Sequence, residues 1–357
     1  MPTIVIQNDH IIRALQVILD PDCPQERRDA FADYYSVDMP EFPQWCTEIQ
    51  RRYPAVAPAN VVLTDSQDEF AAAIGDADAV VVEDFTVGVA ELAAAPNLKI
   101  VQNFRTDMRN VDEAACAKRN ITVLPFHRQV NVAVGEHAFS LMMSLAKKVS
   151  ETNKLLTIEA LQAEGWPARV YDRRHTANSN WARISGVKNM FGSTLGIIGL
   201  GSVGRYVANW ANAFNMKVVY HQRNRLKADL EAEFKATYLS LNDLFAQSDF
   251  ISIHVPLNDS TRGMIGAEQL NAVTRNPIIV NIARADIIQK GALLAALDAG
   301  TLGGVGMDVH YEEPGDPDDP FLPYKKVVMS PHIAIGTRLN GAHDMEALIS
   351  NLANAVG

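Results

Sequence analysis

Short runs of apolar, β-branched residues alternate with helix-like stretches along almost the whole chain, and this alternation restricts the fold more than any other feature. Because parallel strands are joined through long, usually helical crossovers, the pattern predicts βαβ units and parallel sheets covered by helices. The runs fall into two series. The first series has five expected strands, at residues 3–7, 60–64, 78–82, 98–102 and 121–125. The second series has seven, at residues 194–200, 217–221, 237–241, 250–255, 277–282, 304–309 and 326–330.

Two domains are expected, because 357 residues exceed the usual size of one domain. Between the two series, residues 136–148 predict a long helix that connects domains, pairs two subunits or simply packs in a core. Residues 340–356 predict a last helix, which we expect to pack on the first domain. Residues 20–58 and 160–190 fit neither series, and we expect both stretches to be surface excursions.

Composition narrows the class of protein. Hydrophobic residues make up 48% and charged residues 21%, which is typical of a soluble globular protein. A formal net charge of −10 disfavours nucleic acid as the main partner. The first residues lack a secretory signal, and no apolar run is long enough to span a membrane. Three cysteines without a C-x-x-C pair, and no histidine pair at metal-ligand spacing, indicate a cytoplasmic protein without disulfides or a metal.

A glycine motif follows the expected strand 194–200. It reads Gly199-Leu-Gly201-Ser202-Val203-Gly204 and precedes a helical run. In this position the glycines allow a tight turn, let the backbone approach a pyrophosphate and let the helix pack on the strand, while the helix N-terminus faces the phosphates. The motif therefore predicts a dinucleotide site, with an ordinary glycine-rich turn as the alternative.

The next expected strand ends at Gln222, eighteen residues after Gly204. Dinucleotide enzymes usually place Asp or Glu near this point to bind the ribose 2′-hydroxyl group. Here a neutral amide is followed by Arg223 and Arg225, whose guanidinium groups suit a 2′-phosphate. The sequence favours NADP(H), with NAD(H) still possible. The alternative is that the two arginines begin an exposed loop and only aid solubility.

Three further polar residues follow strands of the second series, on the carboxyl side where open α/β sheets bind ligands. They are Arg284, Glu313 and His332. Arg284 suits a substrate carboxylate and a neighbouring carbonyl, His332 can supply or remove a hydroxyl proton during hydride transfer, and Glu313 can orient the imidazole. Taken singly, each residue also has an ordinary structural explanation.

As a set, these motifs resemble the D-isomer-specific 2-hydroxyacid dehydrogenases, and the resemblance covers nearly the whole chain. The matching stretches are LKIVQNF, NVAVGEHAFSLMM, GSTLGIIGLGSVG, HVPLNDSTRGMI, NIARADIIQKGALLAAL, GVGMDVHYEEP and SPHIA. The resemblance implies an α/β fold of two Rossmann-like domains with a cleft between them. A flavodoxin-like substrate domain would comprise residues 1–126 and 333–357, and a doubly wound parallel-sheet NAD(P)-binding domain residues 127–332. A homodimer would form through the helix after Glu136.

The resemblance also implies the function, which is hydride transfer between NADP(H) and a 2-keto acid or D-2-hydroxy acid. Glyoxylate and hydroxypyruvate are the default substrates. Arg284, Glu313 and His332 would be the catalytic residues, and Asp308 would lie at the nicotinamide carboxamide. Further cofactor contacts are expected at Val255, Pro256, Thr261, Ile282 and Ala283.

The chain departs from the family at a loop whose glycines often present backbone amides to the substrate carboxylate. Here the loop begins Phe104-Arg105-Thr106-Asp107, and these four residues are the candidates for substrate binding. Arg105 could meet an additional anionic group, so an acidic or phosphorylated 2-keto acid stays open. The alternative is that Arg105 points away and pairs with Asp107.

Two other functions compete. A formate dehydrogenase-like enzyme would share the fold, the arginine and the histidine, but such enzymes resemble this chain with Gln where Glu313 stands. A dinucleotide-sensing, corepressor-like binding protein would keep the same domains without turnover. Turnover of a 2-keto acid separates these alternatives from the reductase.

Overall fold

The structure, a computed structural model, describes residues 1–356. It divides into two compact units. Unit 1 contains Met1–Val132 together with the residues from Ile335 onward, and unit 2 contains Ala133–Ala334. The chain therefore crosses between units after residues 132 and 334, where the sequence led us to expect crossings after residues 126 and 332.

Within the described residues, unit 1 holds a five-stranded parallel sheet in the order β2-β1-β3-β4-β5, which is the flavodoxin order. The apolar runs form these strands because both faces of the sheet are covered by helices. Along β1, Ile4 and Ile6 pack into one core while Val5 packs into the other. The strands are β1 (Thr3–Gln7), β2 (Asn60–Thr64), β3 (Ala79–Val82), β4 (Ile100–Asn103) and β5 (Thr122–Leu124).

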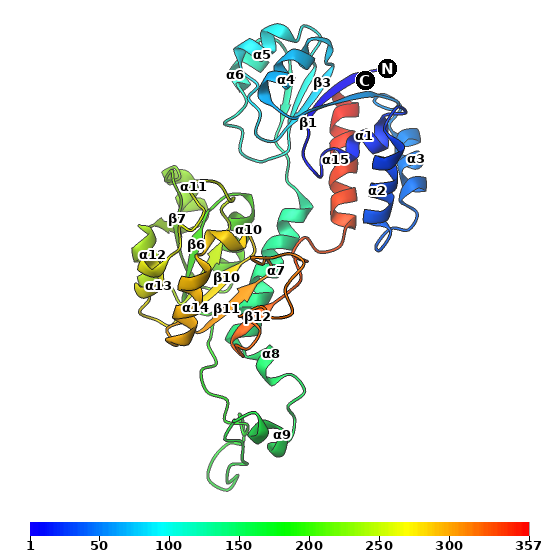
Figure 1. Cartoon of the computed structure of the whole chain (residues 1–357). Helices are drawn as coiled ribbons and strands as arrows, with labels where there is room; N and C mark the ends of the chain where they lie inside the picture. Colours follow the sequence, from blue (N-terminus) through cyan, green and yellow to red (C-terminus); the bar gives the residue numbers. More distant parts are fainter. Residues whose placement is uncertain (357) are drawn as a thin grey trace. The chain divides into compact units, whose positions relative to one another are not determined.

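Different helices cover the two faces of this sheet (Figure 1). The prediction that the last helix packs on the first domain is confirmed, because Met345, Leu348 and Ile349 are fully buried in the unit 1 core. One face carries α1 (Ala14–Leu19), α2 (Gln25–Tyr35), α3 (Phe42–Arg52) and α15 (Leu339–Val356), and the other carries α4 (Gln67–Ala73), the 3-10 turn η1 (Ile74–Asp76), α5 (Val89–Ala94) and α6 (Glu113–Lys118).

Residues 20–58 are not a surface excursion, so that prediction was wrong. They form α2 and α3, and Tyr35, Phe42 and Ile49 from this pair are buried in the core. The rings of Tyr35 and Phe42 stack with their centroids 4.3 Å apart. Because α2 buries only Tyr35 fully, its sequence carries too narrow an apolar stripe to show helical periodicity.

Unit 2 holds a seven-stranded parallel sheet, among the described residues, in the order β12-β11-β10-β9-β6-β7-β8. Counted from β6, this is the doubly wound order with one more strand added at an edge, as predicted. The strands are β6 (Thr194–Ile198), β7 (Lys217–His221), β8 (Ala236–Tyr238), β9 (Phe250–Ile253), β10 (Ile278–Asn281), β11 (Gly304–Met307) and β12 (Val327–Met329).

Helices again cover both faces of the unit 2 sheet (Figure 1). One core contains side chains of α7 (Gln129–Ala146), α10 (Ser202–Ala213) and α11 (Ala228–Glu233), and the other contains side chains of α12 (Leu241–Gln247), α13 (Ala267–Asn271) and α14 (Lys290–Asp298), with the short turn η2 (Ala285–Ile287) before α14.

Helix α7 begins at residue 129, earlier than the predicted 136. The carboxylate of Asp344 accepts hydrogen bonds from the backbone N–H groups of Gln129 and Val130, at 2.8 and 3.5 Å. These bonds satisfy amides that the first turn of a helix leaves free. Asp344 lies more than 200 residues away in the chain, so the local sequence could not reveal the start.

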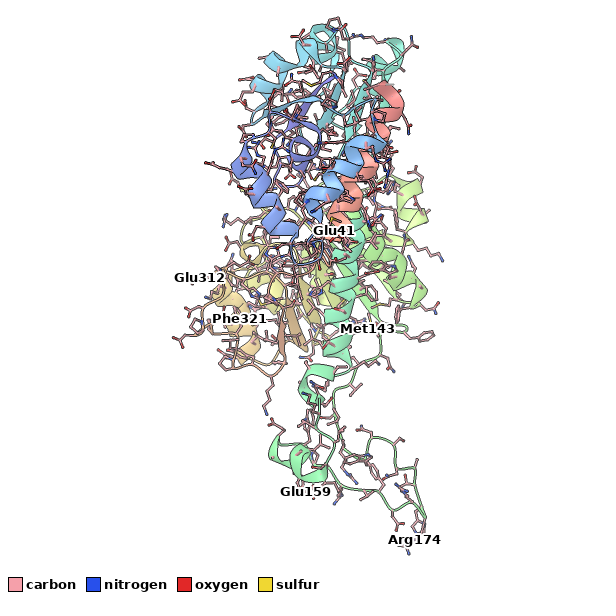
Figure 2. The ribbon with its side chains drawn as sticks, turned by 90° about the vertical axis from the view of Figure 1, so that its right-hand side faces the viewer. Glu41, Met143, Glu159, Arg174, Glu312 and Phe321 are labelled. Atoms are coloured by element: carbon pink, nitrogen blue, oxygen red, sulfur yellow. The ribbon has the colours of Figure 1, made fainter. Side chains whose placement is uncertain are left out.

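The stretch 160–190 is largely irregular, as expected. It belongs to an arm (residues 153–190) that follows α8 (Val149–Thr152) and contains α9 (Ile158–Ala163) before the chain enters β6. Figure 2 labels Glu159 and Arg174 on this arm. The last residues of the arm contact the rest of unit 2 through Lys188, whose Nζ donates to the carbonyl of Arg275 at 3.3 Å.

Candidate active site

The glycine motif forms the turn between β6 and α10, and each glycine meets a different restriction. Gly199 has a φ of 95°, which only glycine adopts freely. A Cβ on Gly204 would stand 2.3 Å from the carbonyl oxygen of Gly199, so only glycine lets α10 pack this closely on the strand. A Cβ on Gly201 would meet no protein atom within 4 Å. This open cradle at a helix N-terminus, beside Ser202 and Val203, fits the pyrophosphate of a dinucleotide.

Gln222 lies at the end of β7 and ties the glycine turn to the next loop. Its Oε1 accepts the backbone N–H of Leu200 at 3.1 Å, and its Nε2 donates to the carbonyl of Asn224 at 2.7 Å. The two arginines after it differ in their environment. Arg225 binds Glu231 in a bidentate ion pair, with both N–O distances 2.8 Å, whereas Arg223 is exposed and has no ion pair among residues 1–356. Only Arg223 therefore keeps its guanidinium free.

Glu231 is held by a second donor. The hydroxyl of Tyr220 donates to its Oε1 at 2.7 Å. The hydrogen bonds from Arg225 and Tyr220 lower the pKa of Glu231 to about 2, so the carboxylate stays ionised at physiological pH. Burial and the hydrogen bond to Glu231 together raise the pKa of Tyr220 to about 12.

The loop after β9 lies against the glycine turn. A Cβ on Gly199 would stand 2.8 Å from Cγ1 of Val255, so this predicted cofactor residue does lie beside the motif. Pro256 and Thr261 shape the loop, since the Thr261 hydroxyl donates to the Pro256 carbonyl at 2.6 Å. Nε2 of His254 shares a hydrogen bond of 2.8 Å with the hydroxyl of Ser252. Burial lowers the pKa of the His254 imidazole to about 3. His254 is therefore neutral and structural.

Arg284 follows β10, and the side chain of Asn281 holds the backbone at this point. The buried Asn281 side chain donates to the carbonyl of Arg284 at 2.8 Å and accepts the N–H of Ala283 at 3.0 Å. Ile282 is buried in the turn. Arg284 itself is exposed, and in the described chain the only hydrogen bond of its side chain is from Nη1 to the Ala283 carbonyl at 2.6 Å. Its guanidinium is free to bind an anion.

Glu313 and His332 lie next to each other, as predicted. Nδ1 of His332 is 2.7 Å from Oε2 of Glu313, and the other carboxylate oxygen accepts the backbone N–H of His310 at 2.8 Å. Burial opposes ionisation, but these hydrogen bonds outweigh it and lower the pKa of Glu313. An ionised carboxylate can only accept, so Nδ1 of His332 carries a proton and Nε2 is the nitrogen left for chemistry.

The backbone of His332 is strained. Its φ is 54°, in the left-handed region that residues with a side chain rarely occupy, and its N–H donates to the carbonyl of Ser330 at 2.9 Å. Observed strain of this kind is concentrated at functional sites, where the surroundings hold it in place. Here the surroundings are a network around Asp308.

Asp308 is fully buried and holds the loop that carries His332. Its Oδ1 accepts the hydroxyl of Ser330 at 2.6 Å and the N–H of Ile333 at 2.9 Å, and its Oδ2 accepts the N–H of Ala334 at 2.7 Å. Burial opposes ionisation, yet these bonds together with His137 lower the pKa of Asp308. Both carboxylate oxygens thus have protein donors, and the contact with a nicotinamide stays a prediction.

His137 on α7 completes this network, and the sequence did not single it out. Its Nε2 lies 2.8 Å from Oγ of Ser330 and 3.3 Å from Oδ1 of Asp308. The only sequence signal was its place in the stretch NVAVGEHAFSLMM. A cavity of about 730 Å³ lies along the same loop and is lined in part by Glu313, Ser330 and His332.

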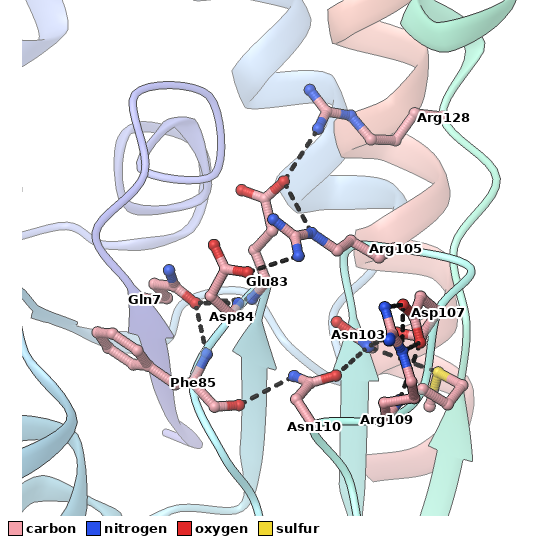
Figure 3. A network of polar contacts seen from close by, with 11 residues as sticks. Gln7, Glu83, Asp84, Phe85, Asn103, Arg105, Asp107, Arg109, Asn110 and Arg128 are labelled. Carbon is pink, nitrogen blue, oxygen red and sulfur yellow. Dashed lines mark hydrogen bonds and ion pairs between the residues drawn. The ribbon is translucent and has the colours of Figure 1, made fainter. Parts of the chain in front are cut away.

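The predicted substrate loop lies in unit 1, after β4 (Figure 3). Arg105 does not pair with Asp107, so that alternative was wrong. Arg105 instead contacts Glu83 at 3.3 Å and Asp84 at 2.5 Å, whereas Asp107 binds Arg109 through Nε at 2.8 Å. The carboxylates that neutralise Arg105 come from the loop after β3, whose proximity the spacing of the residues did not show.

Phe104 and Thr106 flank Arg105 in this loop. Phe104 is fully buried and stacks on Phe126, with the ring centroids 5.5 Å apart. The guanidinium of Arg128 lies over the same ring at 4.3 Å and contacts Glu83 at 3.5 Å (Figure 3). The loop is therefore rigidly packed on one side and carries balanced charges on the other.

Residues 1–356 were compared with the requirements of two further kinds of site. No group of three or more His, Cys, Asp or Glu side chains is arranged to hold a metal ion. In the same part of the chain, no helix combines the length and the apolar character needed to cross a membrane.

Comparison with known proteins agrees with this geometry. Residues 139–334 match the family model described as D-isomer specific 2-hydroxyacid dehydrogenase, NAD binding domain. A glyoxylate reductase of Korarchaeum cryptofilum is 33% identical over 261 residues, covering 72% of this chain and 73% of its own. A glyoxylate/hydroxypyruvate reductase B of Yersinia pseudotuberculosis is 30% identical over 293 residues, covering 82% and 85%.

A solved structure shares the fold over nearly the whole length. The glyoxylate reductase from Paecilomyes thermophila superposes with a TM-score of 0.56 at 24% identity, covering 99% of this chain and 95% of the other. The glycine cradle, the matched domain and the relatives together identify an oxidoreductase with a nicotinamide dinucleotide cofactor. The chain belongs to the D-isomer specific 2-hydroxyacid dehydrogenase family.

Proposed function

We propose that the protein interconverts a 2-keto acid and the corresponding D-2-hydroxy acid, with NADP(H) as the favoured cofactor. The contact of 2.7 Å between His332 Nδ1 and Glu313 Oε2 carries this proposal, because it leaves Nε2 of a half-exposed imidazole as a proton donor or acceptor. The names of the relatives, glyoxylate reductase and glyoxylate/hydroxypyruvate reductase, make glyoxylate and hydroxypyruvate the first substrates to test.

The bound dinucleotide would supply the hydride in the direction of reduction. His332 would donate its Nε2 proton to the carbonyl oxygen as that oxygen gains negative charge, and would take the proton back in the reverse direction. Glu313 would keep the proton on Nδ1 and stabilise the charged ring. Arg284 would bind the substrate carboxylate and orient the adjacent carbonyl, for which its unpaired guanidinium is suited.

The cofactor would lie along the carboxyl edge of the unit 2 sheet. Gly201 and the first turn of α10 would hold the pyrophosphate. Arg223 would bind the 2′-phosphate, because it is exposed and unpaired where Arg225 is engaged by Glu231. The remaining contacts are proposed at Val255, Pro256, Thr261, Ile282, Ala283 and Asp308.

The loop at Phe104, Arg105, Thr106 and Asp107 would receive the substrate from unit 1. Because Glu83 and Asp84 neutralise Arg105, the structure favours a small monocarboxylic 2-keto acid over one with a second acidic group. A dicarboxylic substrate would have to displace these two carboxylates from Arg105.

Initial rates of NADPH and NADH consumption test this function, with glyoxylate, hydroxypyruvate, pyruvate, oxaloacetate and bulkier 2-keto acids as substrates. We expect turnover of a small 2-keto acid with NADPH, and its loss in His332→Ala. Formate oxidation without 2-keto acid reduction would point to a formate dehydrogenase. Tight dinucleotide binding without any turnover would instead favour a dinucleotide-sensing protein.

We also propose a homodimer formed through α7. Of the thirteen exposed large hydrophobic residues within the described chain, seven lie between residues 143 and 214, a region that contains the end of α7 and the arm. Such a concentration of exposed apolar side chains is typical of an interaction surface. Light scattering should give a mass of twice the chain's 39.2 kDa.

A further inference from the structure

Unit 1 contains a partly open cavity that the proposed reaction does not use. Its volume is about 330 Å³, which is within the range of small-molecule sites. Every lining residue belongs to unit 1, so the cavity is complete within that unit. It lies among the turn after β1, helix α2, the start of α7 and the start of α15.

Apolar and aromatic side chains form the body of the cavity. Phe31, Tyr34 and Tyr35 project from α2, and Ile11 and Ile335 come from the two flanking turns. Tyr34 is 43% exposed although it is a large aromatic residue, and Phe31 stacks on Tyr35. A flat or branched apolar group of moderate size would bury these faces.

The polar residues of the cavity are basic. His10, Arg13 and Arg338 line it, and none of the described lining residues is an Asp or a Glu. In a chain with a net charge of −10, a pocket lined by basic residues without a carboxylate is a local exception. An anion is therefore the expected polar group of a ligand.

The two guanidinium groups are only partly satisfied by the protein. Nε of Arg338 is buried and has no hydrogen-bond partner among residues 1–356, and its Nη1 is 3.6 Å from Asp38. Arg13 donates through Nε to the carbonyl of Asp9 at 3.2 Å, and within the described chain its terminal nitrogens make no hydrogen bond. Buried donors without partners are rare in folded proteins, and they indicate a missing acceptor.

Tyr35 adds a neutral donor at the inner wall. Its side chain is 2% exposed, and its hydroxyl lies close to the backbone of Gly341. A Cβ added to Gly341 would stand 3.1 Å from this hydroxyl, so the glycine keeps the space in front of it open. Burial raises the pKa of Tyr35, so the phenol keeps its proton at physiological pH.

We propose that this cavity is a binding site for a small aromatic or branched aliphatic carboxylate. The carboxylate would bind Arg13 and Arg338, and the apolar group would lie against Phe31, Tyr34 and Ile335. Charge-assisted hydrogen bonds from guanidinium groups to a carboxylate, added to buried aromatic contacts, are the usual basis of such recognition. The site is independent of the reductase activity.

Phenylacetate is a suitable probe, because it has the required groups but no keto group to be reduced. The full-length protein is labelled with ¹³C at the isoleucine methyl groups, and phenylacetate is titrated while NMR spectra are recorded. We expect the signals of Ile11 and Ile335 to shift, while that of the buried Ile279 in unit 2 stays unchanged. Phenylacetamide, which has the same shape without the charge, should bind at least tenfold more weakly.

Variants test the assigned contacts. Arg13→Met and Arg338→Met should each weaken phenylacetate binding about tenfold, whereas Arg51→Met, on the exposed side of α3, should leave it unchanged. Phe31→Ala gives a second test that leaves both arginines in place. Equal binding of the acid and the amide, or shifts spread over isoleucines of both units, would overturn the proposal.

Initial rates with glyoxylate then show what the site is for. Competition between phenylacetate and glyoxylate would mean that phenylacetate occupies the substrate site instead, and would overturn the proposal. Inhibition or activation that glyoxylate does not relieve would mean a regulatory site. The NMR titration needs no turnover, so its result stands whether or not the protein reduces a 2-keto acid.

Discussion

Nε2 of His137 lies 3.3 Å from Oδ1 of Asp308 and 2.8 Å from the hydroxyl of Ser330, which joins helix α7 to the loop that carries His332. In the proposed reaction, neither His137 nor Ser330 takes part in the proton transfer. Both are positioning residues, because they act on His332 only through Asp308 and the backbone of the loop.

His137→Ala should lower kcat about tenfold and the free energy of unfolding by about 1–3 kcal/mol, because it leaves a buried carboxylate and hydroxyl without one donor. Steady-state kinetics and urea unfolding measure the two effects. Ser140→Ala is the matched control, since Ser140 is exposed on the same helix and bonds only to the carbonyl of His137. A normal kcat with a shifted unfolding curve would restrict His137 to a structural role.

Glu313→Gln should weaken reduction most at alkaline pH. The lowered pKa of Glu313 keeps its carboxylate ionised at neutral pH, where it accepts the proton on Nδ1 of His332. Without this negative charge beside the imidazole, we expect the alkaline limb of kcat/KM to move to lower pH.

The control for this variant is Glu312→Gln, which removes the same charge one residue away at an exposed position (Figure 2). Its profile should match that of the unmodified protein. If the Glu313→Gln limb did not move, the pairing with His332 would have no part in proton transfer.

Gly201→Ala should lower the affinity for NADPH, whereas Gly204→Ala should lower the stability of the fold. The alanine at 204 would meet the Gly199 carbonyl at 2.3 Å, so we expect a loss of about 1–3 kcal/mol in stability. The alanine at 201 meets no protein atom, so thermal unfolding should change little while NADPH affinity falls. Calorimetry and NADPH fluorescence separate the effects, and tight NADPH binding by Gly201→Ala would exclude this cradle as the pyrophosphate site.

Arg223→Ala should raise the KM for NADPH about tenfold and leave the KM for NADH unchanged. The free guanidinium of Arg223 is the group proposed for the 2′-phosphate, which NADH lacks. Lys227→Ala, at an exposed position in the same loop, is the control for a general change of surface charge. An equal change for both cofactors would contradict the assignment.

Met143→Asp should dissociate the proposed dimer. Met143 is 37% exposed on α7, where a charge would be buried by a partner subunit (Figure 2). Val37→Asp places the same charge on an exposed hydrophobic residue of unit 1 and should leave the mass unchanged. Light scattering at several concentrations distinguishes the variants, and a monomeric parent protein would contradict the proposal.

The strands of both units were predictable because parallel strands that are buried on both faces have continuous apolar sequences. Val80 and Val81, for example, lie on opposite faces of β3, and both are fully buried. The proximity of Glu313 and His332 was predictable for a related reason. Both follow strands that end at the same edge of one sheet, and the spacing matched a known family.

Contacts between distant segments were not predictable. Arg105 meets Glu83 and Asp84 because two loops at the ends of β3 and β4 come together, and several acidic residues were equally possible partners. The pairing of Arg225 with Glu231 depends on how α11 is turned, which one charged residue in a polar helix does not reveal. Helix α2 was missed because its single fully buried residue leaves no periodic pattern.

The network around Asp308 has a further thermodynamic consequence. Its carboxylate binds the hydroxyl of Ser330 and the amides of Ile333 and Ala334, all within the chain itself. The strained conformation of His332 is therefore built during folding, so the conformational entropy of this loop is lost before any ligand arrives. Binding beside His332 therefore spends less free energy on ordering this loop, which favours affinity and orientation.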